Sequence, residues 1–282
     1  MNSETNIDRK TVAGFGDEWS RFDQTGMPDA EAKELFEGYF SIFPWASLPS
    51  NATGFDLGCG SGRWARWVAP RVATLHCIDP SDAIEVARRN LESQPNCVLH
   101  KSGVDDMPLP DQSMDFGYSL GVLHHIPDTQ AALSACVSKL KPGAPFLLYV
   151  YYAFDNKPAW YRFVWRLSDF LRRVVSRMPN ALRYAVSQGI AGLIYWPIAR
   201  ACKLAEMIGV NVSNLPLSSY RNRSFYVMRT DSLDRFGTRL EQRYSAAQIR
   251  EMMGVAGLKN IRFSDASPYW CAVGFAKNIA TK

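Results

Sequence analysis

The sequence lacks the marks of a secreted or membrane-spanning protein. Its six cysteines are scattered without a Cys-x-x-Cys pair, and no apolar run follows a basic start, so neither a disulfide framework nor a signal peptide is indicated. The uncharged stretch 184–199 contains glycines, Gln188 and Pro197, which make it too short and too broken for a transmembrane helix. We therefore expect a cytoplasmic protein with reduced thiols.

Histidine is also scarce, and no RNA-binding aromatic motif is present. The four histidines do not form a spaced ligand set with carboxylates, so we expect no metal site. The formal net charge of +5 is modest for 282 residues, which together with the missing motif argues against a nucleic-acid partner. With 47% hydrophobic and 21% charged residues, the composition is that of an ordinary globular protein.

Three glycines at alternate positions follow a short apolar strand that contains Asp56. In Gly58-Cys59-Gly60-Ser61-Gly62 they allow a tight turn, and they leave backbone amides open to a ligand at the start of the next helix. The dinucleotide fingerprint would need its third glycine at position 63, where Arg63 stands. This spacing therefore disfavours an NAD site. The glycines either bind another cofactor or serve only the tight packing of the turn.

Strands and helices alternate after this turn. Asp79 follows the second apolar strand and lies 17 positions beyond Gly62, close to the spacing of about 20 at which a Rossmann-like site places an acid on the ribose hydroxyls. We favour that role over a surface acid. The expected strands are 54–57, 74–78, 97–100, 113–120 and 145–151, and the expected helices are 82–90 and 129–140. This order predicts an α/β fold with a doubly wound, Rossmann-like parallel sheet.

Two motifs carry a resemblance to a known family. The pattern Asp56-x-Gly58-x-Gly60-x-Gly62 resembles the first motif of class I S-adenosylmethionine-dependent methyltransferases, and Leu123-His124-His125-Ile126-Pro127-Asp128 resembles their fourth. The overall pattern is similar to bacterial small-molecule methyltransferases of the ubiquinone-pathway type. The resemblance covers residues 54–150 and, less closely, 244–276. It implies S-adenosylmethionine as cofactor and S-adenosylhomocysteine as product.

The resemblance also implies where the cofactor would lie. The glycines with Asp56 would hold its methionine part, and the loop 103–106 its adenine. The family's usual acid stands at Gly103 here, so Asp105 or the Val104 amide would take its place. The expected cofactor-binding residues are Trp19, Asp56, Gly58, Cys59, Gly60, Gly62, Asp79, Pro80, Val104, Asp105 and Leu120.

The histidine pair lies at the carboxyl end of the fourth strand, near the expected position of the transferred methyl. An imidazole titrates close to neutral pH and could take a proton from a nucleophile, so His124 and His125 are the candidate bases, with His124 slightly favoured. The alternative is a structural or cofactor-positioning role, because the pair occurs across relatives with different substrates.

The remaining segments define the expected domains. Residues 1–50 form an aromatic-rich helical arm in which Trp19 or Phe22 either covers the cofactor as a lid or packs the arm on the core. Residues 51–150 and 244–282 form the cofactor-binding domain, because the closing helix and hairpin that the family requires appear only after 244 and complete a seven-stranded sheet. Residues 151–243 are thus a largely helical insertion, which in the family holds the acceptor.

This insertion is strongly basic. It contains fifteen basic and six acidic residues, a net charge of +9, which leaves −4 for the rest of the chain. Apolar residues between Trp160 and Met178 recur at helical spacing with arginines beside them. Such a helix could cover the substrate pocket, form a homodimer face or make peripheral contact with an anionic membrane, and we favour burial within the cap.

The second half of the insertion combines arginine, tyrosine and small hydroxyl residues. Guanidinium groups bind carboxylates or phosphates bidentately, so we expect some of Tyr220, Arg221, Arg223 and Tyr226 to contact an anionic acceptor. A solvated loop with internal Arg–Asp pairs, such as Asp231 or Asp234 with Arg235, is the alternative.

We therefore predict an enzyme that transfers a methyl group from S-adenosylmethionine to a small polar acceptor by in-line displacement. Two alternatives remain at this stage. The enzyme could use the same cofactor for chemistry other than methylation, or the chain could be a non-catalytic cofactor-binding or scaffold protein on this fold.

Overall fold

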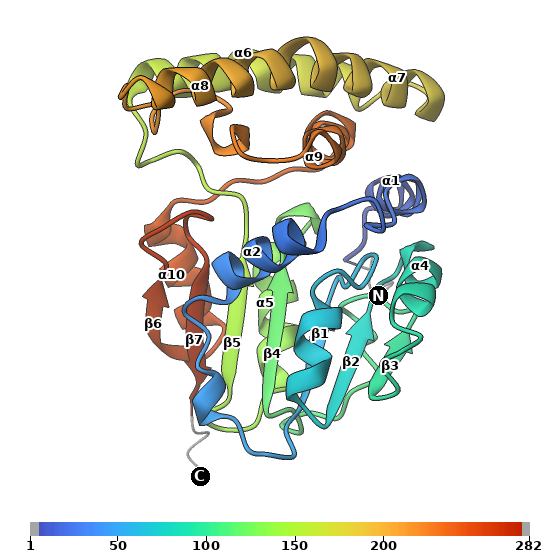
Figure 1. Cartoon of the computed structure of the whole chain (residues 1–282). Helices are drawn as coiled ribbons and strands as arrows, with labels where there is room; N and C mark the ends of the chain where they lie inside the picture. Colours follow the sequence, from blue (N-terminus) through green and yellow to red (C-terminus); the bar gives the residue numbers. More distant parts are fainter. Residues whose placement is uncertain (1–5, 278–282) are drawn as a thin grey trace.

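A seven-stranded sheet forms the centre of the molecule in the computed structural model, which describes residues 6–277. The strand order is β3-β2-β1-β4-β5-β7-β6, and only β7 runs antiparallel to its neighbours (Figure 1). The strands are β1 Thr53–Leu57, β2 Thr74–Ile78, β3 Cys97–His100, β4 Phe116–Leu120, β5 Pro145–Tyr149, β6 Leu258–Phe263 and β7 Ala272–Ala276. The predicted α/β fold with a Rossmann-like seven-stranded sheet is confirmed.

The strand order places a topological switch point between β1 and β4. The chain builds outward from β1 through β2 to β3, and then returns to the other side of β1 to form β4 and β5. The two helices that follow β1 and β4 therefore cover opposite faces, and a crevice opens above the carboxyl ends of these strands. The expected strand 113–120 begins only at Phe116, because Met114 makes an isolated bridge with Leu140.

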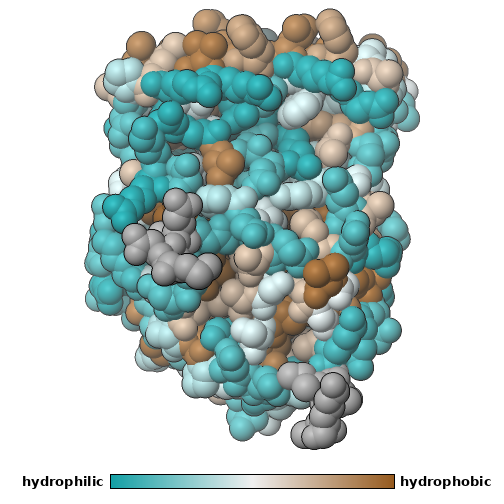
Figure 2. Space-filling model, turned by 180° about the vertical axis from the view of Figure 1, so that it is seen from behind, coloured by the Kyte–Doolittle hydropathy of each residue, from teal (hydrophilic) through white to brown (hydrophobic). Residues whose placement is uncertain are grey.

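Helices beyond the strand ends cover this crevice in layers (Figure 1). Helices α6, α7 and α8 form the outermost layer, and α9 and α1 lie between that layer and the sheet. Seen from behind, the outermost layer carries hydrophobic side chains along its upper edge (Figure 2). The bounds are α1 Arg9–Arg21, α2 Asp29–Phe40, α6 Ala159–Val175, α7 Asn180–Ile190, α8 Trp196–Met207 and α9 Phe225–Gly237, with a π-helical turn Ala191–Tyr195 between α7 and α8.

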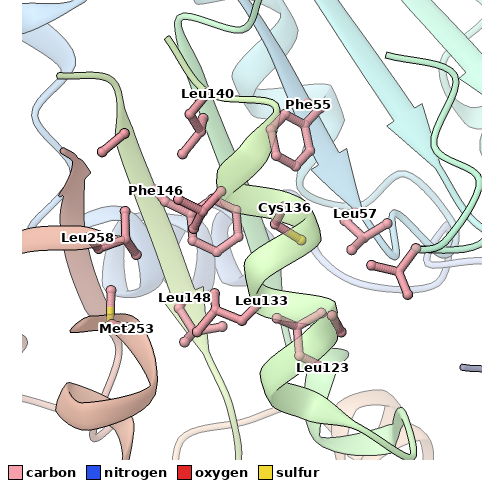
Figure 3. Packing of buried hydrophobic residues seen from close by; sticks show 14 of the residues in the cluster. Phe55, Leu57, Leu123, Leu133, Cys136, Leu140, Phe146, Leu148, Met253 and Leu258 are labelled. Atoms are coloured by element: carbon pink, nitrogen blue, oxygen red, sulfur yellow. The ribbon is translucent and has the colours of Figure 1, made fainter. Parts of the chain in front are cut away.

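Two apolar clusters hold the sheet between its flanking helices. On one face, Phe55 and Phe146 pack against Leu133 of α5 and Met253 of α10 (Figure 3). On the other face, Phe36 of α2 joins the strand side chains. The flanking helices are α3 Ala65–Val68, α4 Ala83–Asn90, α5 Thr129–Ser138 and α10 Ala246–Val255. Both α5 and α10 begin with a side-chain cap, which satisfies backbone amides at their first turns.

The closest packing in the sheet lies between β1 and β4, so Gly54→Ala should destabilise the protein. A Cβ on Gly54 would lie 2.2 Å from Cε1 of Phe116, which is buried and cannot withdraw. We expect a loss of about 1–3 kcal/mol in the free energy of unfolding, measured as a lower urea midpoint. Gly189→Ala in α7 is the matched control, because nothing lies within 4 Å of its Cβ position. An unchanged midpoint for Gly54→Ala would contradict this packing.

Candidate active site

A large cavity lies above the carboxyl ends of β1, β2 and β4. Its volume is about 1020 Å³, and its wall includes the glycine turn, the loop after β4, helix α1 and the helices that follow β5. Small-molecule pockets usually measure about 300–1,000 Å³, so this cavity is large enough for a cofactor and an acceptor together.

The glycine turn forms the floor of the cavity. Gly58, Gly60 and Gly62 all have positive φ angles, between 53° and 78°, which side chains rarely allow. Gly58 and Cys59 donate backbone hydrogen bonds to the carbonyl of Ile78 at the end of β2. Gly58, Cys59 and Gly60 line the cavity, so the turn is held rigidly at the place where a ligand would contact its backbone.

Asp79 fixes the glycine turn from the end of β2. One carboxylate oxygen accepts a hydrogen bond from the Gly60 amide at 2.9 Å, and the other accepts from the amide and hydroxyl of Ser81 at 2.9 and 2.6 Å. Burial raises the pKa of Asp79. A carboxylate has about four acceptor sites, so Asp79 can hold the turn and still accept hydrogen bonds from a ligand in the cavity.

The N-terminal arm lies across the glycine turn. A Cβ on Gly60 would lie 3.1 Å from Nε1 of Trp19, so the indole rests directly on that glycine. The Arg63 guanidinium lies 5.2 Å from the Trp19 ring and 4.3 Å from the Trp64 ring. Contact between Trp19 and a bound cofactor stays a prediction, but the arm does cover the floor of the cavity, as a lid would.

The arm is also tied to the loops after β3 and β4. The backbone amide of Asn6 donates to the Asp105 carboxylate at 2.6 Å. The side chain of Asn6 donates one hydrogen bond to the Asp128 carbonyl and accepts one from the Asp128 amide, both at 2.8 Å. Ile7 packs on Gly103, whose Cβ would lie 2.7 Å from Ile7 Cδ1. Val104 lines the cavity beside them, so this corner is a slot bounded by the arm and by the loop after β3.

His125 faces the cavity, whereas His124 does not. Nδ1 of His125 lies 2.6 Å from the carbonyl oxygen of Leu240, and because a carbonyl only accepts, Nδ1 carries the proton. Nε2 therefore holds a lone pair, and it has no hydrogen-bond partner among residues 6–277. Burial lowers the pKa of His125, so the ring is neutral at pH 7. A neutral ring with an unpartnered nitrogen can accept a proton, and a role of His125 as general base stays a prediction.

His124 lies behind its neighbour in the short 3-10 turn Leu123–His125. It is fully buried, and its ring centroid lies 3.8 Å from that of His125 and 4.0 Å from that of Tyr151. Burial holds its pKa well below the usual value, so His124 is neutral as well. Its place between two rings supports the orientation of His125 rather than contact with a ligand.

Three acids that the sequence did not single out also line the cavity. Glu18 comes from α1, and Asp231 and Asp234 come from successive turns of α9. Burial, and then the neighbouring Asp234, raise the pKa of Asp231 to about 6, and the same two causes hold the pKa of Glu18 well above its usual value. Tyr151 donates a short hydrogen bond to Asp234.

A sequence signal for these acids did exist. Glu18 stands within the aromatic segment Phe15–Phe22, where an acid on the buried face of a helix is unusual. Asp231 and Asp234 were expected to pair with Arg235 if the loop were solvated, but Arg235 instead pairs with Glu241 at 2.7 Å. The two acids are therefore left facing the cavity, a result that depends on a contact outside their own helix.

Five predicted residues do not reach the cavity wall. Two of them are Asp56 and Gly62, on either side of the glycine turn's cavity-lining residues. Asp56 is buried within β1, where burial raises its pKa to about 8. Gly62 faces the end of α4, because a Cβ at this position would lie 2.9 Å from Leu91. Asp105 is taken up by Asn6 of the arm. The other two are His124 and Tyr226, whose hydroxyl accepts a hydrogen bond from the Gln24 amide at 2.9 Å.

The other predicted residues do line the cavity, and the arginines among them are already paired. Cys59, Pro80, Val104 and Leu120 join the wall around the floor, and Tyr220, Arg221 and Arg223 join it on the opposite side. Arg221 pairs with Glu206 at 2.8 Å, and Arg223 pairs with Glu34 at 3.1 Å. Their positive charges are therefore partly neutralised before any ligand binds.

The floor of the cavity coincides with a known domain. Residues 55–148 match the family model described as a methyltransferase domain. The ubiquinone biosynthesis O-methyltransferase of Alkalilimnicola ehrlichii is 28% identical, over 55% of this chain and 69% of its own length. That of Pseudomonas syringae pv. tomato is 26% identical, over 73% of this chain and 96% of its own.

A solved structure shares the fold. The O-methyltransferase family protein from Burkholderia thailandensis has a TM-score of 0.53 at 13% identity, over 94% of this chain and 59% of that chain. The matched domain, the relatives and the seven-stranded sheet agree with the glycine turn and Asp79 described above. Together these findings support a class I S-adenosylmethionine-dependent methyltransferase.

Proposed function

We propose that this methyltransferase moves the methyl group of S-adenosylmethionine, by in-line displacement, to a hydroxyl of a small-molecule acceptor, with His125 as general base. The observation that carries the proposal is that His125 lines the cavity as a neutral ring whose Nδ1–H is held by Leu240, which leaves the Nε2 lone pair without a partner among residues 6–277. A hydroxyl must lose its proton as it attacks, so it needs such a base. The O-methyltransferase names of the relatives support an oxygen nucleophile.

Family and fold imply S-adenosylmethionine as methyl donor, and the chain offers it a fitting cradle. We place the methionine part against the backbone of Gly58, Cys59 and Gly60, which lines the cavity. The three amides expected to be open to a ligand are already hydrogen-bonded to Ile78 and Asp79, so the glycines would serve by leaving room for the cofactor. Asp79 and Pro80 would hold the ribose, and the slot at Val104 would take the flat adenine. Leu120 and Trp19 would close the two sides, with Arg63 near enough to Trp19 to meet the carboxylate of the cofactor.

The chain's task in this reaction is positioning. The sulfonium of the bound donor supplies the electrophile, so no residue has to activate it covalently. The protein holds acceptor and donor in line and excludes water, which can contribute several kcal/mol, up to about 7–11 in the best-oriented cases. The arm over the glycine turn supplies this exclusion on the cofactor side.

We propose that the acceptor lies between His125 and the insertion. In this division residues 1–50 cover the cofactor, 51–150 and 244–282 bind it, and 151–243 hold the acceptor. Tyr220, Arg221, Arg223 and Tyr226 remain the proposed contacts of an anionic group. Lys157 joins them, because it lines the cavity and has no carboxylate partner among residues 6–277. Its ammonium donates to the Ser213 carbonyl and the Asn214 side chain.

Transfer of label tests the activity directly. Purified protein is incubated with S-adenosylmethionine carrying tritium in the methyl group and with a panel of phenols, phenol carboxylates and amines. We expect label in an organic product that contains a new O-methyl group. Labelled N-methyl products would contradict the hydroxyl acceptor. Release of S-adenosylhomocysteine with label in no acceptor would favour other chemistry with the same cofactor.

Asp79→Asn should weaken binding of S-adenosylhomocysteine by about tenfold or more in a calorimetric titration. The substitution removes the charge that would accept the ribose hydroxyls, and hydrogen bonds to charged groups contribute about 1.5–3 kcal/mol. Asp82→Asn is the matched control, because its side chain is 80% exposed and pairs only with Lys101. Equal affinity of Asp79→Asn and wild type would remove Asp79 from the ribose site.

His125→Gln should lower kcat by about 10²–10⁴-fold and leave the affinity for S-adenosylhomocysteine unchanged. Burial lowers the pKa of His125, so its basic form is present down to a pH below the ordinary histidine value of 6.5. In the wild type we therefore expect kcat to fall with decreasing pH only below about 6.5. This decrease of kcat at low pH, the acid limb of the pH profile, should be absent in His125→Gln.

Two variants keep this assignment testable. His124→Gln should retain the acid limb, since His124 does not face the cavity. Burial raises the pKa of Asp231 to about 6, so the titration of Asp231 could also produce the acid limb. Asp231→Asn decides which of the two residues produces it. A limb that survives in His125→Gln and disappears in Asp231→Asn would transfer the role of base to Asp231.

A further inference from the structure

The exposed apolar side chains of this protein are concentrated on one layer. Within residues 6–277, all the exposed large hydrophobic side chains except Val98, Phe225 and Val255 lie between residues 160 and 215. The most exposed are Leu193 at 82% and Ile208 at 80%. They belong to α6, α7, the π-helical turn, α8 and the segment that follows, which form the outermost layer in Figure 1. Soluble monomers rarely expose so extended an apolar surface without a partner for it.

Helix α6 shows how this surface arises. Its buried face, with Asp169, Arg172 and Val175, packs toward α9, and its exposed face carries an apolar stripe at helical spacing. The stripe consists of Trp160, Phe163, Val164, Leu167, Leu171 and Val174. Phe170, 72% exposed, widens it on one side. The apolar face of α6 is thus turned away from the protein, contrary to the expected burial within the cap.

The charges that border this layer are almost all positive. Arg162, Arg166 and Arg173 of α6, Arg177 just after it and Lys203 of α8 are exposed. The only exposed acid of α6–α8 is Glu206, which pairs with Arg221, and all these helices lie in the described part of the chain. Figure 2 shows the hydrophobic upper edge with hydrophilic side chains directly below it. An apolar face with basic residues at its border is complementary to an anionic lipid surface.

The apolar layer is continuous with the cavity. Val164 and Leu171 of α6, Ile194 of the π-helical turn and Ile198 of α8 each line the cavity and are also 39–43% exposed. Leu215 does the same at 41%. The cavity wall and the outer surface therefore share side chains, and the gap between α6 and α8 is apolar on both sides.

We propose that the outer face of α6–α8 rests on an anionic bilayer and that the acceptor is an amphiphile whose apolar chain passes through this gap. Its polar end would lie in the cavity near His125, and its chain would extend into the lipid. No helix of the described residues is long and apolar enough to cross a membrane, so the contact lies in the plane of the interface. The membrane contact stands by itself, whereas the acceptor class rests on the function proposed above.

Sedimentation with vesicles tests the membrane contact. The wild type should bind vesicles that contain phosphatidylglycerol and phosphatidylcholine, and bind pure phosphatidylcholine more weakly. Phe170→Glu with Leu193→Glu should lower binding by tenfold or more, because both side chains lie on the outer face and neither lines the cavity. Val255→Glu on α10 is the matched control, at 69% exposure outside this layer. Equal binding of the paired variant and the control would overturn the proposal.

A charge pair separates electrostatic attraction from apolar insertion. Arg166→Gln with Arg177→Gln should weaken binding to the anionic vesicles by about fivefold per charge and leave binding to pure phosphatidylcholine unchanged. Arg250→Gln on α10 serves as control. The apolar layer could instead be covered by a second copy of the chain. Light scattering of the protein without vesicles measures whether it forms a dimer. A stable dimer that Phe170→Glu with Leu193→Glu dissociates, together with no vesicle binding, would overturn the proposal.

Alkylphenols of increasing chain length test the acceptor class by binding alone. In calorimetric titrations with S-adenosylhomocysteine present, affinity should rise with chain length, by up to about fourfold per methylene. Leu171→Asn with Ile198→Asn should reduce this gain without changing the affinity for S-adenosylhomocysteine. Normal S-adenosylhomocysteine binding with no effect of chain length would overturn the amphiphile and spare the proposed function. Loss of S-adenosylhomocysteine binding by the wild type would overturn the function itself.

Discussion

The hydrogen bond between the Asp79 carboxylate and the Gly60 amide links the parts of this molecule that have to meet. It joins the end of β2 to the turn after β1, and so it fixes the glycine backbone at the switch point of the sheet. Trp19 rests on the same glycine, and the loop that carries His125 packs on Gly58 through Val122. The arm, the floor and the candidate base therefore all take their positions from one short turn.

Most of the sheet could be predicted from the sequence because its central strands are buried on both faces and are almost continuously apolar. The strand 74–78 was predicted to the residue, since it is bounded by turn residues, whereas the strand 113–120 was predicted too long, since pairing and not composition decides where β4 begins. The glycine turn could be predicted equally well, because positive φ angles at three alternate positions leave little choice of residue there. These features depend on local sequence.

The site was less predictable where it depends on contacts between distant segments. The sequence pointed to both histidines, but only the contact with the Leu240 carbonyl, more than a hundred residues away, shows that Nε2 of His125 carries the lone pair. Only the fold shows that His125 and not His124 lines the cavity. Asp105 was expected beside the adenine, but its carboxylate is held by Asn6 of the arm and it does not line the cavity. Likewise, the basic insertion suggested free arginines around the acceptor, and ion pairs with Glu34, Glu206 and Glu241 now account for several of them.

The placement of the arm has a consequence for the order of events in turnover. Trp19 and the pinned Asn6 cover the side of the cavity where the cofactor would lie, while the apolar gap between α6 and α8 opens on the opposite side. If the two ligands bind as proposed, replacing the spent cofactor would require the arm to lift, whereas exchanging the acceptor would not. Movement of the arm would then be one step of every cycle, as closure and opening are in many enzymes. An enzyme resting on a surface could pass from one acceptor to the next without leaving it.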